Sequence, residues 1–202
     1  FRLGNEYIVR LPRVEQVPGR VHKSINKEYK WISQIAQHLS IPISEPVFKG
    51  SPNNLYPWPW MVMKWNEGDN PDFEQANEYH EFAKELADFL NQLHSVKLAN
   101  GPASRRGVPL IHLDEQTRQA ISELEGEVDI KRVLDLWEQL THIKPWDKPS
   151  VWVHGDFLPG NILIENYHLT AVIDFSDLGV GDPACDLVIA WALLGASSRD
   201  IF

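Results

Sequence analysis

The sequence predicts an α+β fold with two lobes, a small β-rich lobe followed by a larger, mainly α-helical one. Short segments rich in β-branched and aromatic residues dominate the first part of the chain. A break rich in Asn, Gly and Pro follows at residues 66–71. Beyond it, apolar residues recur mostly at helical spacing, interrupted by one hairpin. We therefore place the first lobe at residues 1–66 and the second at residues 67–202.

The first lobe is expected to hold four short strands and one helix. The segment FRLGNEYIVRLP has a Gly4-Asn5 turn between two strands, and Pro12 ends the second strand. Apolar residues at helical spacing predict a helix over residues 24–39, with Ser24 as its N-cap. A short strand at 46–48 and a buried strand at 60–65 complete the lobe.

The second lobe is expected to be helical around a small β structure. Helices are predicted at 73–96, 115–124, 130–140 and 185–195, the last strongly apolar and buried. Strands are predicted at 151–153, 162–164 and 169–173, with a turn near residues 166–168 between the last two. Residues 100–110 and 178–184 are predicted to be loops.

Composition excludes several classes of protein. A net charge of −9 argues against a nucleic-acid partner, because a phosphate backbone needs a basic surface. There is no run of 18 apolar residues to span a membrane and no visible signal peptide. The single cysteine, Cys185, allows no internal disulfide, so we expect a reducing, cytoplasmic environment. Because the chain starts at Phe1 inside a strand and stops at Phe202 without a breaker, we expect it to be truncated at both ends.

The segment HGDFLPGN, residues 154–161, has the spacing H-x-D-x-x-x-x-N of the protein kinase catalytic loop. In such a loop the aspartate, here Asp156, faces the hydroxyl that accepts the phosphoryl group. The asparagine, here Asn161, reaches the metal. The histidine supports the loop backbone, so His154 is expected to be structural.

A second carboxylate follows on the far side of a predicted hairpin. Asp174 comes directly after the strand 169–173, so the hairpin would bring it close to Asn161 at its open end. One amide oxygen and one carboxylate suit Mg²⁺, which keeps several of its waters. An isolated H-x-D or a lone aspartate after a strand usually marks a turn or a cap, but the combination favours a site.

HGDFLPGN, VIDFSDLGVGDPACDL and the order of the lobes resemble the aminoglycoside phosphotransferase family of small-molecule kinases, which have a protein-kinase-like fold. Gly155, where protein kinases have arginine, favours these small-molecule kinases. The resemblance implies that Asp156 is the catalytic base, that Asn161 and Asp174 bind Mg²⁺, and that ATP or GTP donates the phosphate. It also implies that Asp182 and Asp186 tie the catalytic loop to the helix that follows.

The same resemblance extends to nucleotide-binding residues in the first lobe. Arg10 stands where kinases have a lysine, and Glu28 stands where the next helix supplies the partner glutamate. We expect Arg10 to grip the nucleotide phosphates and to bind Glu28 bidentately. Residues 63–66, with Met63, Lys64 and Trp65, resemble the hinge that binds the nucleotide base.

The sequence leaves the acceptor open. An acidic balance suits an aminoglycoside, and Asp177 and Asp182 are candidate contacts for such a polycation. Macrolides, choline, homoserine and sugars are acceptors in related families. Two other classes are a non-catalytic, kinase-like nucleotide-binding module and a metal-dependent hydrolase built on His154, Asp156 and Asp174. The hydrolase would need more histidines nearby, and the oligomeric state is not predicted.

Overall fold

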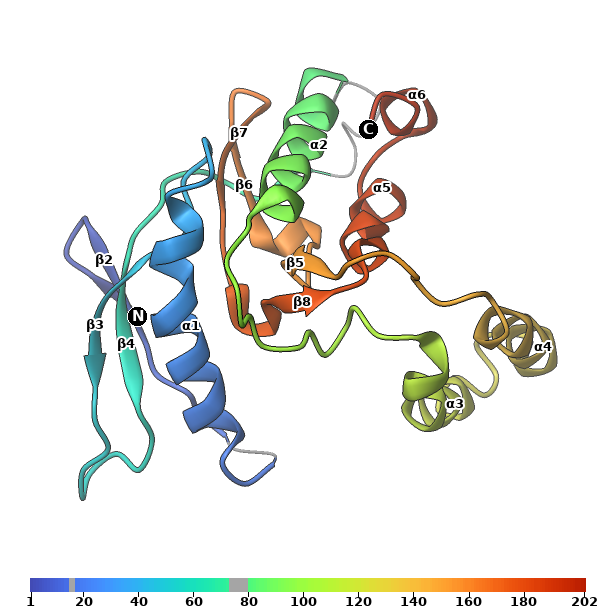
Figure 1. Ribbon diagram of the computed structural model, residues 1–202, viewed down its shortest axis with the longest axis horizontal. Coiled ribbons are helices and arrows are strands. Elements are labelled where there is room, and N and C mark those ends of the chain that lie inside the picture. The colour runs from blue at the N-terminus through green and yellow to red at the C-terminus, as the bar shows by residue number, and fades with distance from the viewer. Residues whose placement is uncertain (15–16, 73–79) are drawn as a thin grey trace.

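The computed structural model describes residues 1–14, 17–72 and 80–202. Two lobes lie side by side, as Figure 1 shows, with the blue strands and helix on the left and the green, orange and red elements on the right. This arrangement confirms the predicted α+β, two-lobed architecture.

The first lobe is a four-stranded antiparallel sheet with one helix against it. The strands are β1 (Arg2–Leu3), β2 (Tyr7–Arg10), β3 (Pro46–Gly50) and β4 (Trp60–Lys64), in the order β1-β2-β4-β3. Helix α1 (Arg20–Ala36) buries Ile25, Ile32 and Ile35 in a core that Met61 and Met63 of β4 also enter. The register pairs Arg10 with Met61, which sets the position of Arg10 at the end of β2.

The start of α1 differs from the prediction. The helix begins at Arg20, after Gly19 in a left-handed conformation (φ +75°), so Ser24 lies inside the helix and is not its N-cap. Ser24 Oγ donates instead to Glu28 Oε1, 2.8 Å away and one turn along. The serine therefore supports the buried glutamate.

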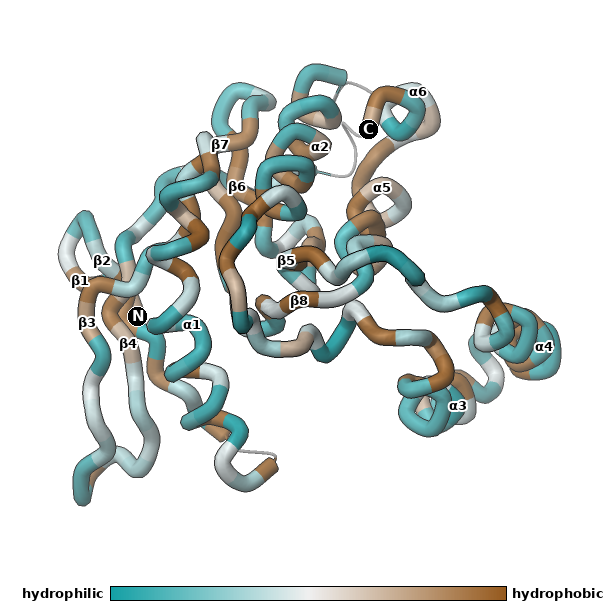
Figure 2. The backbone as a smooth tube through the Cα atoms, in the orientation of Figure 1, coloured by the Kyte–Doolittle hydropathy of each residue, from teal (hydrophilic) through white to brown (hydrophobic). Residues whose placement is uncertain are grey.

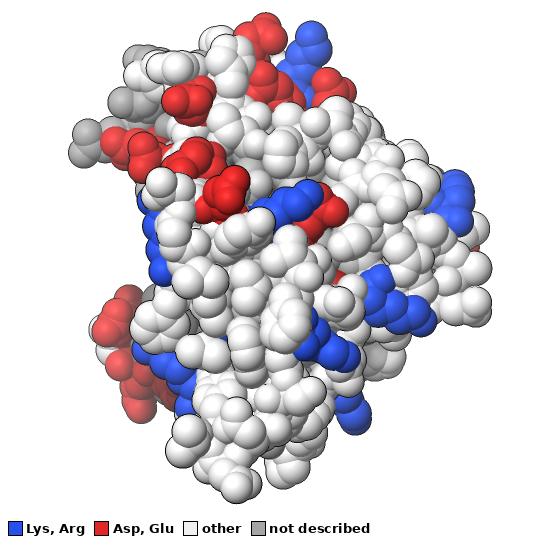
Figure 3. All heavy atoms as spheres, turned by 90° about the vertical axis from the view of Figure 1, so that its left-hand side faces the viewer, with Lys and Arg blue, Asp and Glu red and all other residues white. Residues whose placement is uncertain are grey.

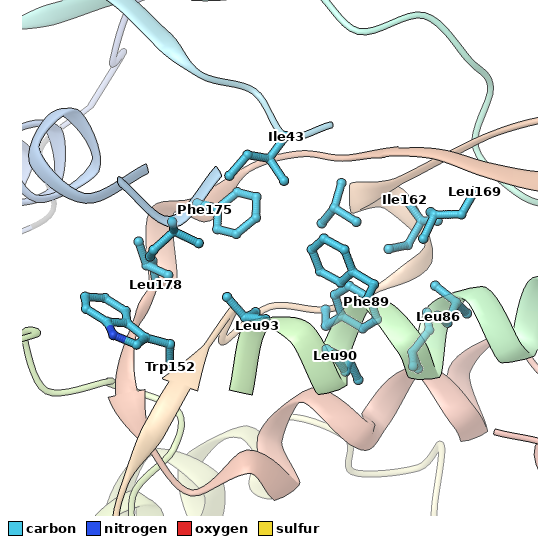
Figure 4. Close-up of a cluster of buried hydrophobic side chains, with 14 of the residues drawn as sticks. Ile43, Leu86, Phe89, Leu90, Leu93, Trp152, Ile162, Leu169, Phe175 and Leu178 are labelled. Atoms are coloured by element: carbon cyan, nitrogen blue, oxygen red, sulfur yellow. The ribbon is translucent and has the colours of Figure 1, made fainter. Parts of the chain in front are cut away.

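The second lobe is organised around α2 (His80–Ser95). Residues 73–79 of the helix predicted at 73–96 lie outside the described residues. Strand β5 (Val151–Val153) pairs with β8 (Gly179–Gly181), and β6 (Ile162–Glu165) forms a hairpin with β7 (His168–Val172). In Figure 4, Leu86, Phe89, Leu90 and Leu93 of α2 face the apolar side chains of these strands. The hairpin and the β5–β8 pair are thus held on one core.

Two helices stand apart from this core. The turn η2 (Leu110–Leu113) leads into α3 (Asp114–Ser122), and α4 (Ile130–Thr141) packs beside α3 (Figure 1). Asp114 Oδ1 joins them, accepting from Trp137 Nε1 at 2.7 Å and from Arg118 Nε at 2.8 Å. Apolar and polar stretches alternate along both helices in Figure 2, which fits their amphipathic sequences.

Two predictions for the end of the chain were wrong. The predicted loop 178–184 contains β8. Glycines are poor strand residues, but β8 forms because its backbone pairs with β5 and lies against residues 103–107. The predicted buried helix 185–195 is a 3₁₀ segment, η5 (Pro183–Val188), followed by the short α5 (Ile189–Ala192). Trp191 is 70% exposed, so only part of this segment is buried. A further short helix, α6, spans Ala196–Arg199.

Charge is distributed unevenly over the surface. On the face shown in Figure 3, acidic side chains gather in the upper part and again at the lower left, and basic ones are spread over the rest of the face. Among the described helices, none combines the length and apolar character that crossing a membrane requires.

Candidate active site

The segment predicted as a catalytic loop runs from the end of β5 into η3 (Pro159–Asn161). Asn161 Nδ2 donates to the backbone oxygen of Asp156 at 2.8 Å and to its carboxylate Oδ2 at 3.2 Å. Phe157, between them, is fully buried and stacks on Phe89 of α2 with ring centroids 5.7 Å apart. The loop is therefore anchored in the core while the Asp156 side chain stays 32% exposed.

His154 is fully buried and links the loop to the end of the hairpin. Its Nε2 lies 3.0 Å from the oxygen of Ile173, and its Nδ1 accepts from the Asp156 backbone N–H at 3.2 Å. These bonds fit a neutral imidazole with its proton on Nε2. Both partners are backbone groups, which supports the structural role expected of His154.

Asp186 holds the same loop from the other side. Its carboxylate is fully buried and accepts from the backbone N–H groups of His154 and Gly155, each at 2.9 Å. His94 Nε2 of α2 lies 3.1 Å from the same carboxylate. Asp182, predicted to act with Asp186, instead caps the turn η5 by accepting from the N–H of Ala184 at 2.8 Å. Of the two, Asp186 is the one that holds the loop.

The hairpin brings Asp174 beside Asn161, as the spacing predicts. The N–H of Ile173 donates to the oxygen of Asn161 at 2.9 Å, and Asp174 follows directly. Asp174 has a left-handed backbone (φ +56°) and starts the turn η4 (Phe175–Asp177), where its Oδ1 accepts from Ser176 N–H. A non-glycine residue in this conformation is strained, and such strain concentrates at functional sites.

Arg10 connects the two lobes. Its Nη1 donates to Glu28 Oε2 in a very short contact, and its Nη2 lies 3.3 Å from Asp174 Oδ1. The predicted contact with Glu28 is present, but the predicted bidentate form is not, because the two terminal nitrogens of Arg10 serve different carboxylates. One guanidinium thus spans the sheet, α1 and the end of the hairpin.

Burial governs the ionisation of two neighbouring groups on α1. Burial raises the pKa of the fully buried Glu28, while Arg10 and the hydrogen bond from Ser24 oppose this effect. Burial also lowers the pKa of Lys27, whose Nζ donates to the oxygen of Ser176 at 2.7 Å. Lys27 is a site residue that helical spacing alone did not identify, because its contact crosses between the lobes.

A cavity of about 430 Å³ opens between the sheet and the hairpin end, and we call it the sheet cavity. Arg10, Met63, Ser44, Ile173 and Asp174 are among its lining residues. Of the predicted hinge residues, Met63 lines it, whereas Lys64 and Trp65 do not. Lys64 Nζ pairs with Glu45 Oε1 at 2.7 Å, and the backbone N–H of Trp65 already donates to the backbone oxygen of Glu6 at 2.8 Å.

Asp177, predicted as a substrate contact, is largely occupied by arginine. Arg105 Nη2 lies 3.0 Å from each of its carboxylate oxygens, and Arg106 Nε lies 3.5 Å from Oδ2. Arg106 Nη2 also lies 3.8 Å from Asp156 Oδ1. The sequence pattern places these two arginines in the predicted loop of residues 100–110 and assigns them no role. Adjacent arginines between Gly/Pro-rich stretches were the available signal.

Asn70, in the predicted break at residues 66–71, has a positioning role that the sequence pattern does not indicate. Its Nδ2 donates to backbone oxygens of Pro159, Gly160 and Ile162 at 2.9–3.2 Å, so it fastens the segment between the lobes to the catalytic loop.

The donor set near the hairpin end fits a magnesium ion better than a transition-metal centre. Asn161 and Asp174 offer an amide oxygen and a carboxylate, a small set that leaves positions for waters and phosphate oxygens. Within the described residues, no group of three or more His, Cys, Asp or Glu side chains is arranged to hold a metal.

Comparison with known proteins now decides the family. The sequence matches the profile of the phosphotransferase enzyme family, APH, over residues 1–202. The chain belongs to this family. The family assignment confirms the predicted resemblance and shows a kinase whose acceptor is a hydroxyl group.

Relatives of known sequence include the aminoglycoside 3'-phosphotransferase of Salmonella typhimurium. It is 28% identical over 191 residues, which cover 91% of this chain and 68% of that protein. The uncharacterised protein YcbJ of Bacillus subtilis is 29% identical over 170 residues, covering 78% of this chain and 51% of that protein.

Solved structures of aminoglycoside and macrolide phosphotransferases share the fold. Wild-type aminoglycoside 2'-phosphotransferase-IIIa, in its GDP complex, superposes with a TM-score of 0.69 at 21% identity, covering 98% of this chain and 69% of that chain. Macrolide 2'-phosphotransferase MphH from Brachybacterium faecium gives 0.65 at 22% identity, covering 96% and 66%. The likeness confirms the kinase-like, two-lobed fold.

Proposed function

We propose that this phosphotransferase moves the γ-phosphate of ATP or GTP to a hydroxyl of a small molecule, with Asp156 as the base. Asp156 is the partly exposed carboxylate of a loop whose backbone is fixed by His154 and Asp186. This single observation carries the proposal, because a base must be held still while its carboxylate faces the substrate.

In the proposed reaction the acceptor oxygen forms a bond to the γ-phosphorus, and the bond from that phosphorus to the β-phosphate oxygen breaks. The hydroxyl proton passes to the Asp156 carboxylate and then to solvent, and a nucleoside diphosphate leaves. Asn161 and Asp174 would hold Mg²⁺, which neutralises charge on the phosphates when bound. Arg10, positioned by Glu28, contacts the phosphate chain from the first lobe.

Residues 1–66 are proposed as the nucleotide-binding lobe and residues 67–202 as the lobe with the catalytic loop. The sheet cavity, with Met63 as an apolar wall and Arg10 and Asp174 at its charged end, has the chemistry for a base and its phosphates. Lys64 and Trp65 would flank this site from the end of β4 and beyond, and would not line it. The names of a relative and a structural neighbour give an aminoglycoside and a macrolide as their acceptors, so both compound classes belong in any screen.

The decisive experiment compares wild type with Asp156→Asn in a screen of ATP and GTP against aminoglycosides, macrolides, choline and homoserine. We expect Asp156→Asn to lose at least about 100-fold in turnover, because it removes the base. Nucleotide affinity, measured by calorimetry with Mg²⁺, should stay within a few-fold of wild type. Turnover at the wild-type rate would refute the assignment. Absence of nucleotide binding in the wild-type protein would refute phosphate transfer altogether.

A further inference from the structure

The loop of residues 103–107 presents Arg105 and Arg106 on a rigid backbone beside the proposed base. The N–H of Ser104 donates to the oxygen of Val180 in β8 at 2.8 Å, and the N–H of Asp182 donates to the oxygen of Gly107 at 3.0 Å. Ser104 Oγ, itself buried, accepts from the N–H groups of Arg106 and Gly107. The position of both arginines is therefore set by the β8 edge.

The two guanidinium groups have donors to spare. Arg105 donates from Nη2 to both carboxylate oxygens of Asp177, whose side chain is only 14% exposed. Arg106 is 52% exposed, and its recorded contacts to Asp177 and Asp156 are long, at 3.5 and 3.8 Å. A guanidinium has five N–H donors, so Arg106 keeps capacity for a ligand next to Asp156.

Both arginines also line a cavity of about 650 Å³ between their loop and α3, which we call the arginine cavity. The other described residues around it are neutral or basic: Val108, His112, Leu113, Gln116, Thr117 and Ala120. No described lining residue has a carboxylate. In a chain with a net charge of −9, this cavity is a local exception.

Resting on the function proposed above, we infer that the arginine cavity binds the acceptor and that this acceptor carries an anionic group, a carboxylate or a phosphate, recognised by Arg106. Arg106 lies between the cavity and Asp156. An acceptor whose anionic group binds the Arg106 guanidinium would therefore hold its own hydroxyl near the proposed base. A polycationic acceptor would instead meet two arginines at the cavity wall, and the adjacent carboxylates, Asp177 and Asp156, already lie within ion-pair distance of these arginines. The proposed site therefore differs from one that selects a cationic acceptor through acidic side chains.

The test measures binding first, using glycerate, glycerol 3-phosphate, glycerol and kanamycin as probes in the presence of Mg²⁺ and ADP. We expect the wild-type protein to bind one or both anions at least tenfold more tightly than glycerol, and the ranking of glycerate against glycerol 3-phosphate identifies the anion. Arg106→Gln should remove this preference, Arg106→Lys should restore part of it, and Arg106→Glu should favour kanamycin. Arg132→Gln, an exposed arginine on α4, is the matched control and should behave as wild type.

Three results would overturn the inference: kanamycin binding more tightly than both anions, an anion preference that survives Arg106→Gln, or no anion binding up to roughly 10 mM, above the usual range of substrate affinities. Slow hydrolysis of ATP and GTP, compared between wild type and Asp156→Asn, tests phosphate transfer separately. Absence of an anion preference in the wild-type protein, with Asp156-dependent hydrolysis intact, would reject this acceptor class alone. An intact preference without Asp156-dependent hydrolysis would reject the function.

Discussion

At the scale of single residues, the backbone of the proposed catalytic loop is held by Asp186 and His154. Asp186 binds the N–H groups of His154 and Gly155, and His154 returns a bond to the N–H of Asp156. Gly155 itself has a left-handed backbone (φ +81°), and an added Cβ would lie 2.6 Å from the backbone oxygen of Asp177. Both the backbone conformation and the close contact therefore require glycine at position 155.

We expect Gly155→Ala to lose at least about 2 kcal/mol of unfolding free energy, since a left-handed alanine is strained and its Cβ meets backbone. Urea unfolding followed by tryptophan fluorescence measures the loss. Gly160→Ala is the matched control in the same loop, because a Cβ there meets nothing within 4 Å. Equal stability of the two variants would contradict this account.

The sequence could predict these residue types because their spacing is local. H-x-D-x-x-x-x-N and the aspartate after the hairpin lie close in the chain, and their contacts follow from one loop and one turn. Arg105, Arg106 and Lys27 could not be identified in this way. Their partners, Asp177, Asp156 and Ser176, are brought to them only by tertiary packing.

At the scale of elements, one carboxylate joins α2 to the β6–β7 hairpin. Glu85 of α2 lies 2.7 Å from His168 Nδ1 through Oε1 and accepts from the N–H of Leu169 at 2.7 Å through Oε2. The hydrogen bond and charge of Glu85 raise the pKa of His168. This contact lies at the turn end of the hairpin, opposite the end that carries Asn161 and Asp174.

This pair predicts a pH-dependent contribution to stability. A histidine whose pKa is raised on folding stabilises fully below its ordinary pKa of about 6.5, and the contribution is lost as pH rises through the folded value. The stability difference between wild type and His168→Gln should therefore be larger at pH 6 than at pH 9. Urea midpoints at the two pH values measure it, with the exposed His22→Gln on α1 as control. A difference independent of pH would count against the ion pair.

The elements that sequence patterns misjudged share a physical cause. The apolar run 185–195 reads as one helix, but Pro183 starts a 3₁₀ turn and Asp186 must point inward to the catalytic loop. The sequence pattern does not predict strand β8, because two of its three residues are glycines that permit close approach to residues 103–107. In both places a contact distant in sequence overrides local propensity.

At the scale of the whole molecule, the two lobes meet through Arg10. Its guanidinium contacts the fully buried Glu28 of α1 and Asp174 at the end of the hairpin, while Lys27 reaches the oxygen of Ser176. The Arg10–Glu28 contact is expected from the resemblance to kinases, in which a strand lysine pairs with a glutamate of the next helix. The sequence did not predict that Asp174 would share the arginine, because that requires the lobes to be placed relative to each other.

Arg10→Met should destabilise the protein at pH 8 by on the order of 3 kcal/mol, because it leaves the Glu28 carboxylate buried without its cation. Burial then raises the pKa of Glu28 further above its ordinary value of 4.5. A carboxyl group with a raised folded pKa becomes destabilising as pH rises from that ordinary value through the folded one. The loss in Arg10→Met should therefore shrink between pH 8 and pH 5.

The double variant Arg10→Met/Glu28→Gln separates this charge effect from lost packing. Glutamine keeps the shape of Glu28 without its charge, so the double variant should be more stable than Arg10→Met at pH 8 and should lack the extra pH dependence. Urea unfolding of wild type, both single variants and the double variant at pH 5 and pH 8 completes the cycle. If the double variant were as unstable as Arg10→Met at pH 8, Arg10 would stabilise through packing or through Asp174. Glu28 is fully buried and its carboxylate accepts hydrogen bonds from Arg10 and Ser24. We therefore expect its charge to account for most of the stability lost in Arg10→Met.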